Sequence, residues 1–150
     1  MELEKEIHQN TGFKSDYHKL VVNIIYSYSW VTGLVKERLS TKEVTLQQYN
    51  ILRILRGQYP NPATINLLKE RMLDKMSDAS RIVERLVQKD LVTRTINKAD
   101  RRAVDIVITE KGLNILRELD PIVTPEDILR RNLSESEAEQ LNVLLDKLRG

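Results

Sequence analysis

The chain contains no cysteine, and its 150 residues include only five glycines, one tryptophan and one phenylalanine. The absence of cysteine excludes disulfide bonds, thiolate metal sites and cysteine-based redox sensing. The glycines are scattered, so there is no glycine-rich phosphate loop, and neither a nucleophile elbow nor a cluster of histidines is present. His8 and His18 lie ten residues apart without acidic or histidine partners at ligand spacing. We therefore predict that the protein is not an enzyme and holds neither a metal nor a cofactor.

Long apolar runs are missing as well. No stretch approaches the roughly 18 consecutive apolar residues of a membrane-crossing helix, and the N-terminus is charged where a secretory signal would be apolar. These features predict a cytoplasmic protein without a membrane partner. With 41% hydrophobic and 31% charged residues, the chain has the composition of one ordinary globular domain. The net charge of +2 is too small to indicate nucleic acid by itself, so the position of the charges matters more.

The residues that are present recur mostly at helical spacing. A wide apolar stripe predicts a long helix over residues 15–39, and a second helix is expected to end at Gly57 and the run YPNP. Pro121 ends a later helix, and the run TPED at 124–127 supplies a cap, a first-turn proline and two first-turn acids. We expect helix caps at Thr45, Thr64, Ser77 with Asp78 behind it, Thr109, Thr124 and Ser134.

Between two of these helices the period changes from helix to strand. Apolar and polar residues alternate on both sides of the run ADRR, with Val92, Arg94 and Ile96 before it and Val104, Ile106 and Ile108 after it. This period of two predicts a hairpin of half-buried strands. Two short helices joined by a tight turn and followed by a hairpin are the order of a winged helix-turn-helix. Met72 and Met76, near that turn, are expected to fill the core.

The helix before the hairpin has the pattern of a recognition helix. A buried stripe of Ile82, Val83, Leu86 and Val87 leaves the remaining side chains on other faces, namely Asp78, Ser80, Arg81, Glu84, Arg85 and Gln88. Arg81 could bind guanine with two hydrogen bonds, and Ser80 and Gln88 could contact phosphate or base. Between Lys69 and Arg102 there are ten basic and six acidic residues, which gives this segment +4 and the rest of the chain −2. The positive charge lies where DNA would lie.

The hairpin tip carries Asp100, Arg101 and Arg102. An arginine on a hairpin tip can enter a minor groove that is narrowed at A·T-rich sequence, where negative potential is concentrated. Asp100 would be repelled by phosphate unless it is paired, so we expect it to hold an arginine such as Arg101 or Arg85. The simpler interpretation is that the polar tip is only solvated and its charges do little.

The segment SDASRIVERLVQKDLVTRTINKADRRAVDIVITEKGLNIL, residues 77–116, closely resembles the MarR family of bacterial transcriptional regulators. TLQQYNILRIL at 45–55 and LSESEAEQLNVLLDKLR at 133–149 are similar to the second and last helices of that family. The resemblance implies a mainly α winged helix-turn-helix with a small β-hairpin wing, and a homodimer on double-stranded DNA. It implies dimerisation by residues 1–40 and 113–150 and DNA binding by 41–112. Pro121 and Pro125 depart from the single long helix of many members, which leaves the dimer geometry open.

The resemblance also assigns roles to residues by position. Arg102 is expected to be the minor-groove arginine, and Asp100 is expected to buttress the wing. The complete set of expected DNA-binding residues is Ser77, Asp78, Ser80, Arg81, Arg85, Gln88, Lys98, Arg101 and Arg102. The aromatic residues Tyr26, Trp30 and Tyr49 lie on helices that line a ligand pocket in the family, although core packing is the commoner role for such residues.

Together these features predict a MarR-like repressor that binds a pseudo-palindromic operator and is released by a small aromatic or amphipathic ligand. Without cysteine, such an effector would bind non-covalently. One alternative is a winged-helix module for protein association without a DNA role, whose binding would respond less steeply to salt. Another is a DNA-binding protein that activates, or that acts without any ligand.

Overall fold

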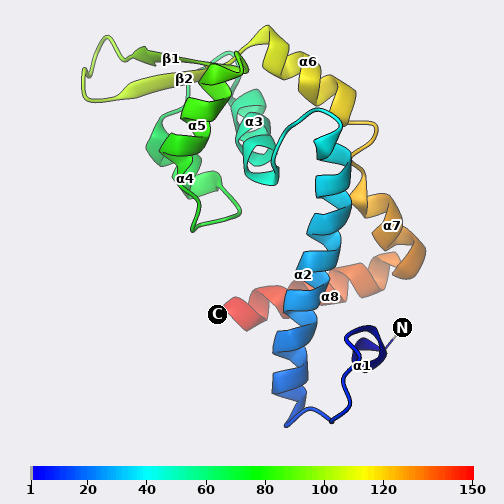
Figure 1. The fold of residues 1–150 in the computed structure, drawn as a ribbon. Coiled ribbons are helices and arrows are strands. Elements are labelled where there is room, and N and C mark those ends of the chain that lie inside the picture. The colour runs from blue at the N-terminus through cyan, green and yellow to red at the C-terminus, as the bar shows by residue number, and fades with distance from the viewer. Residues whose placement is uncertain (1) are drawn as a thin grey trace. The chain divides into compact units, whose positions relative to one another are not determined.

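The computed structural model describes residues 2–150 and is mainly helical with one two-stranded antiparallel hairpin (Figure 1). The predicted order of helices, tight turn, hairpin and helices is confirmed. The elements are α1 (Leu3–Glu6), α2 (Asp16–Ser40), α3 (Leu46–Gln58), α4 (Ile65–Arg71), α5 (Ala79–Gln88), β1 (Val92–Ile96), β2 (Val104–Ile108), α6 (Glu110–Leu119), α7 (Pro125–Asn132) and α8 (Glu135–Arg149).

The chain forms two compact units, with the boundary between Leu34 and Val35 inside α2. The N-terminal region was expected to extend to residue 40. Residues 35–40 belong to the second unit instead, because Val35 and Leu39 are buried in its core. In the first unit, Lys19 donates a 2.7 Å hydrogen bond to Glu4 Oε1. This bond holds the pKa of the Glu4 carboxyl below its ordinary value. The dimerisation roles expected for residues 1–40 and 113–150 remain predictions.

The core of the second unit is made by side chains from α2, α3, α4, α5, the hairpin and α6. Leu52, Leu86, Ile106 and Leu116 are completely buried there and come from four different elements. Burying a leucine or isoleucine side chain contributes about 1.5–3 kcal/mol, so this shared core fixes the position of α5 and the base of the hairpin.

The helix caps agree with the sequence at several places. Thr45 and Ser134 form capping boxes with Gln48 and Glu137, and Thr64 and Thr109 accept hydrogen bonds from backbone N–H groups three residues later. At Thr124 the side chain makes no capping hydrogen bond, and Pro125 begins α7 in its first turn. The capping residues therefore fix where most of the helices begin.

The prediction that Ser77 caps α5 is wrong by one position. Asp78 is the N-cap, and its Oδ1 accepts a 3.1 Å hydrogen bond from the backbone N–H of Arg81. The Ser77 hydroxyl instead donates to Asp74 Oδ2 at 2.7 Å. Serine and aspartate are both good N-caps. Because the Ser77 hydroxyl is bound to the Asp74 carboxylate in the preceding turn, Asp78 caps the helix.

Helix α3 ends at Gln58, between Gly57 and the run YPNP, as the sequence predicted. One further expectation fails in the same lobe. Met72 is buried as expected, whereas Met76 is 94% exposed. Met76 lies in the turn between α4 and α5, after the point where the chain has left the core.

The hairpin is buried only at its base. β1 and β2 pair in register from Val92 opposite Ile108 to Ile96 opposite Val104. The expected alternation holds in β2, where Ile106 and Ile108 are buried, but in β1 only Val92 is buried and Ile96 is 68% exposed. Figure 1 shows why, since the far end of the hairpin projects away from α5 and the neighbouring helices.

A third extended segment joins the base of the hairpin. Ala63, just before α4, exchanges two backbone hydrogen bonds of 2.9 Å with Ile106 in β2. Sequence periodicity did not indicate this bridge, because a single paired residue has no period. The bridge connects the start of α4 directly to the wing strand.

Candidate nucleic-acid interface

Helix α5 presents one polar face to solvent, as a recognition helix must. Ala79, Val83 and Leu86 are completely buried, and the opposite face is exposed. That face carries Ser80, Arg81, Glu84, Arg85 and Gln88. The spacing of these residues follows the helical repeat, so their side chains form one continuous strip.

The arginines on this strip have no acidic partners in the part of the chain that the structure describes. Among residues 2–150, no ion pair includes Arg81, Arg85, Arg101, Arg102 or Lys98. Unpaired guanidinium groups on an exposed face can bind phosphate or the edge of guanine without first breaking an internal salt bridge. The predicted basic residues therefore remain available for an anionic partner.

The turn that precedes α5 is held by Asp74. Its carboxylate accepts hydrogen bonds from the Ser77 hydroxyl and from the Met76 backbone N–H, at 2.7 and 3.0 Å. These bonds, that to Ser77 foremost, lower the pKa of Asp74 below its ordinary value. The Leu73 backbone N–H donates to Asn50 on α3 at 3.0 Å, which connects the turn to the core helix. The start of α5 is thus fixed by polar contacts that sequence reasoning did not identify.

A cleft of about 330 Å³ lies between the N-terminal ends of α3 and α5. Its walls combine hydroxyl, amide and charged groups with one apolar side chain. The lining residues are Thr45, Gln47, Gln48, Ser77, Asp78, Arg81, Ile82 and Arg85. Four of the residues expected to bind DNA are therefore also the walls of an open cleft that could admit a small anion.

The connection from α5 to β1 is a tight turn in which Asp90 has a φ of +59°. The Asp90 N–H donates to the Val87 carbonyl and the Leu91 N–H to the Leu86 carbonyl, which is the hydrogen-bond pattern of a Schellman motif. Aspartate tolerates this left-handed conformation better than most residues. The turn sets the direction in which the hairpin leaves α5.

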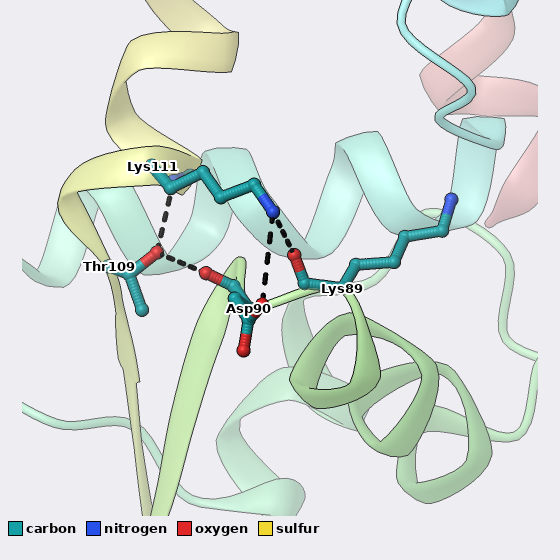
Figure 2. A network of polar contacts seen from close by, with 5 residues as sticks. Lys89, Asp90, Thr109 and Lys111 are labelled. Carbon is teal, nitrogen blue, oxygen red and sulfur yellow. Dashed lines mark hydrogen bonds and ion pairs between the residues drawn. The ribbon is translucent and has the colours of Figure 1, made fainter.

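Thr109 and Lys111, at the start of α6, form hydrogen bonds to this turn, as Figure 2 shows. The Thr109 hydroxyl donates to the Asp90 carbonyl and the Lys111 ammonium donates to the Lys89 carbonyl, both at 2.8 Å. Lys111 also lies 3.9 Å from the Asp90 carboxylate. Gly112 allows the approach, because a Cβ at that position would come 2.7 Å from Ile108 Cγ1 and even closer to the Leu91 carbonyl oxygen. The end of α5, the wing base and the start of α6 therefore form one junction.

At the wing tip, Lys98, Arg101 and Arg102 are exposed, as expected for residues that reach into DNA. The expectation that Asp100 holds Arg101 or Arg85 is not met. Its Oδ1 accepts a 2.9 Å hydrogen bond from the backbone N–H of Arg102, two residues further on. Aspartate readily closes a local turn in this way, and this requires less ordering than an ion pair between two long exposed side chains. Asp100 still braces the wing, but by binding its backbone.

Asn97 and Asp105 are functional candidates that the sequence analysis missed. The Asn97 amide nitrogen donates to both carboxylate oxygens of Asp105, at 3.0 and 3.1 Å. The Asn97 side-chain oxygen accepts from the backbone N–H groups of Ala99 and Asp100, at 2.8 and 2.9 Å. The signal in the sequence was an asparagine at the start of a polar tip, since asparagine often hydrogen-bonds the backbone two residues on. The partner eight residues away had no such signal.

The three aromatic residues expected to line a ligand pocket fall in different units. Tyr26 and Trp30 belong to the first unit, where Trp30 is 41% exposed. Tyr49 belongs to the second, where it is buried in the core and has the Arg53 guanidinium 5.7 Å from its ring centre. Core packing accounts for Tyr49, and a pocket that includes Tyr26 and Trp30 remains a prediction.

Two kinds of feature are missing from residues 2–150. Within that range, no three histidine, aspartate or glutamate side chains are grouped so as to hold a metal ion. None of the helices in the same range combines the length and apolar character needed to cross a membrane.

Comparison with known proteins agrees with the geometry of the lobe. The model of the MarR family matches residues 44–104, which extend from the start of α3 to the beginning of β2. A mutant MarR from E. coli complexed with operator DNA is similar with a TM-score of 0.77 and 26% sequence identity, over 99% of both chains. Wild-type apo MarR from E. coli has a TM-score of 0.65 and 28% identity, over 83% of this chain and 93% of that one.

A more distant structure shares the fold. BpsR from Bordetella bronchiseptica, whose DNA binding is regulated by 6-hydroxynicotinic acid, has a TM-score of 0.73. Its sequence identity is 19%, over 88% of this chain and 99% of that one. At this identity the similarity concerns the fold alone.

Proposed function

We propose that this chain, whose residues 44–104 match the model of the MarR family, is a repressor that binds a pseudo-palindromic operator as a homodimer. In this proposal α5 enters the major groove, where Arg81 and Arg85 contact guanine or phosphate. The wing lies over the adjacent minor groove, with Arg102 as the inserted arginine and Arg101 and Lys98 on the phosphates.

The observation that carries this proposal is the exposed strip of α5 together with the cationic wing tip. Both surfaces belong to the same lobe, and their arginines make no ion pairs within residues 2–150. A strip of hydrogen-bonding groups on a helix is suited to base edges, whereas an arginine on a hairpin is suited to a narrow groove. A surface used only for protein association would not require both.

Exposed apolar side chains support the homodimer. On α2, Tyr17 is 84% exposed, and Ile25 and Tyr28 are each 63% exposed. On α8, Val143 and Leu144 are each 62% exposed. Such residues along two helices are unfavourable in water and are typical of surfaces that a partner covers. A second copy of the chain would cover them and would place two recognition helices about 34 Å apart, one turn of the duplex.

A small ligand is proposed to release the DNA. Besides the Asp78 carboxylate, which caps α5, the cleft between α3 and α5 offers Arg81 and Arg85 together with amide and hydroxyl groups, which suit the carboxylate of a small aromatic acid. Regulation of BpsR by 6-hydroxynicotinic acid is a precedent for an effector of this chemistry on the same fold. Because the two arginines are also proposed to contact DNA, a bound anion would compete with phosphate for them.

The decisive experiment is selection of bound sequences from random double-stranded DNA with the purified protein. Enrichment of a pseudo-palindrome, with affinity that falls steeply as salt rises, is the expected result. Half-sites about one helical turn apart would identify a dimer with two-fold symmetry. If nothing is enriched even at low salt, the DNA role is refuted and protein association becomes the better explanation of the exposed surfaces.

A further inference from the structure

We propose that Asn97 and Asp105 are the positioning residues of the wing, which hold its tip in the DNA-binding shape before DNA arrives. The inference rests on the proposed function, because it concerns how the wing is presented to the operator. Neither residue is proposed to touch DNA. Their role is to fix the backbone that carries Lys98, Arg101 and Arg102.

The geometry places Asn97 at the centre of the tip. Its side-chain oxygen accepts the N–H groups of Ala99 and Asp100, and its amide nitrogen is held by both carboxylate oxygens of Asp105 on β2. Its own backbone N–H donates to the Ala103 carbonyl at 3.0 Å. Asn97, which directly follows β1, is therefore bonded both to the turn and to β2.

Beyond these bonds, Asp100 accepts hydrogen bonds from the Arg102 and Ala103 N–H groups, and burial of side chains adds little. Ile96, the last residue of β1, is 68% exposed, and residues 98–102 are all exposed. Without burial in the core, the conformational entropy of these residues has to be offset by local hydrogen bonds. A tip that was disordered in the free protein would have to be ordered on binding, and this cost would lower the affinity for DNA.

The charge of Asp105 argues for the same role. A carboxylate at the base of a tip that faces phosphates opposes binding by simple electrostatics. Asp105 lies directly opposite Thr95 in the hairpin register and is partly buried, with its side chain against Asn97. A carboxylate makes a stronger hydrogen bond than a neutral acceptor, so the unfavourable charge is explained if it serves to hold Asn97.

The test uses a substitution for which the two explanations predict opposite signs. Asp105→Ala removes one negative charge from the DNA-binding lobe, so electrostatics alone predicts tighter binding. If Asp105 positions Asn97, the variant instead binds the selected operator about tenfold more weakly, because hydrogen bonds to a charged group are lost and the tip must be ordered on binding. Glu70→Ala, an exposed acid on α4 outside this network, is the charge control and is expected to bind as tightly as the wild type or more tightly.

Reversing the pair provides the rescue. In Asn97→Asp with Asp105→Asn, the carboxylate and the amide exchange places, and the net charge of the wild type is kept. The carboxylate introduced at position 97 can accept from the Ala99 and Asp100 N–H groups and from the new amide at position 105. We expect affinity within about threefold of the wild type, whereas Asn97→Asp alone, with two facing carboxylates, binds more weakly than either.

Amide hydrogen exchange gives a readout that does not involve DNA. In Asp105→Ala, exchange of the Ala99 and Asp100 N–H groups is expected to accelerate, while that of the Val83 and Leu86 N–H groups in α5 stays unchanged. Unchanged exchange at the tip, or tighter operator binding by Asp105→Ala, would overturn the inference. If the wild type enriches no DNA, the proposed function fails, and the exchange experiment still decides whether the pair orders the tip.

Discussion

Replacing Gly112 with alanine should destabilise the protein, although alanine is the better helix former. Gly112 lies in the first turn of α6, where its N–H donates to the Thr109 hydroxyl at 3.1 Å. An added Cβ would lie 2.7 Å from Ile108 Cγ1 and would meet the Leu91 carbonyl, which already accepts the Thr109 N–H at 3.0 Å. Because the obstacle includes backbone, α6 or the α5–β1 turn must shift.

The magnitude follows from three contributions. Overpacking a filled site typically costs about 1–3 kcal/mol, and a displaced carbonyl hydrogen bond adds about 1 kcal/mol. The gain in helix propensity from glycine to alanine offsets about 1 kcal/mol. The net expectation is a loss of about 2 kcal/mol in the free energy of unfolding, or a melting temperature lower by about 4–8 °C for a chain of this size.

Gly57→Ala is the matched control. Gly57 is exposed inside α3 and a Cβ there would meet nothing within 4 Å, so this variant should be more stable by up to about 1 kcal/mol. Urea unfolding followed by circular dichroism, with all variants at one protein concentration, measures both changes. A Gly112→Ala variant as stable as the wild type, or shifted in the same direction as Gly57→Ala, would show that the added Cβ meets no steric obstacle.

Three further predictions concern the DNA-binding lobe. Arg102→Ala should weaken operator binding and reduce the slope of log affinity against log salt by about 1, measured by fluorescence anisotropy; an unchanged slope in a folded dimer would contradict a DNA contact. The hydrogen bond from Ser77 lowers the pKa of Asp74 in the folded state. The stability that the Asp74 carboxylate contributes is therefore present at neutral pH and is lost as the pH falls below the ordinary value of 3.8. Asp74→Ala should lower the urea midpoint at neutral pH but not in stronger acid. Met72→Ala should cost about 2–5 kcal/mol in urea unfolding, whereas Met76→Ala should change stability by less than about 0.5 kcal/mol, and equal losses would show that burial is not the cause.

Most of the fold could be predicted because its signals are local. The helical stripe of α5, the caps at Thr45 and Thr109 and the alternation in β2 each depend on residues a few positions apart. The errors arose where two local signals competed. Ser77 and Asp78 are both good N-caps, and only the position of Asp74 decides between them.

The interface was predictable to the extent that it consists of surface residues on regular elements. The arginines of α5 and the wing are exposed as expected. The partners that fix the wing were not predicted, because hydrogen bonds from Asn97 to Asp105 depend on the hairpin register rather than on any periodicity. Asp100 was expected to pair with an arginine side chain because of its charge. It accepts the nearby backbone N–H of Arg102 instead, which costs less conformational entropy than ordering a long side chain.

The bridge between Ala63 and Ile106 has a consequence for regulation. It joins the start of α4 to β2, and the junction at Asp90 and Lys111 joins α5 and β1 to α6. The helix-turn-helix is thereby connected to the wing through both α4 and α5. Packed cores of this kind move as rigid bodies rather than deforming continuously. A ligand proposed to act in the cleft between α3 and α5 would therefore compete for Arg81 and Arg85 without deforming the helix-turn-helix and the wing, whose internal geometry stays unchanged.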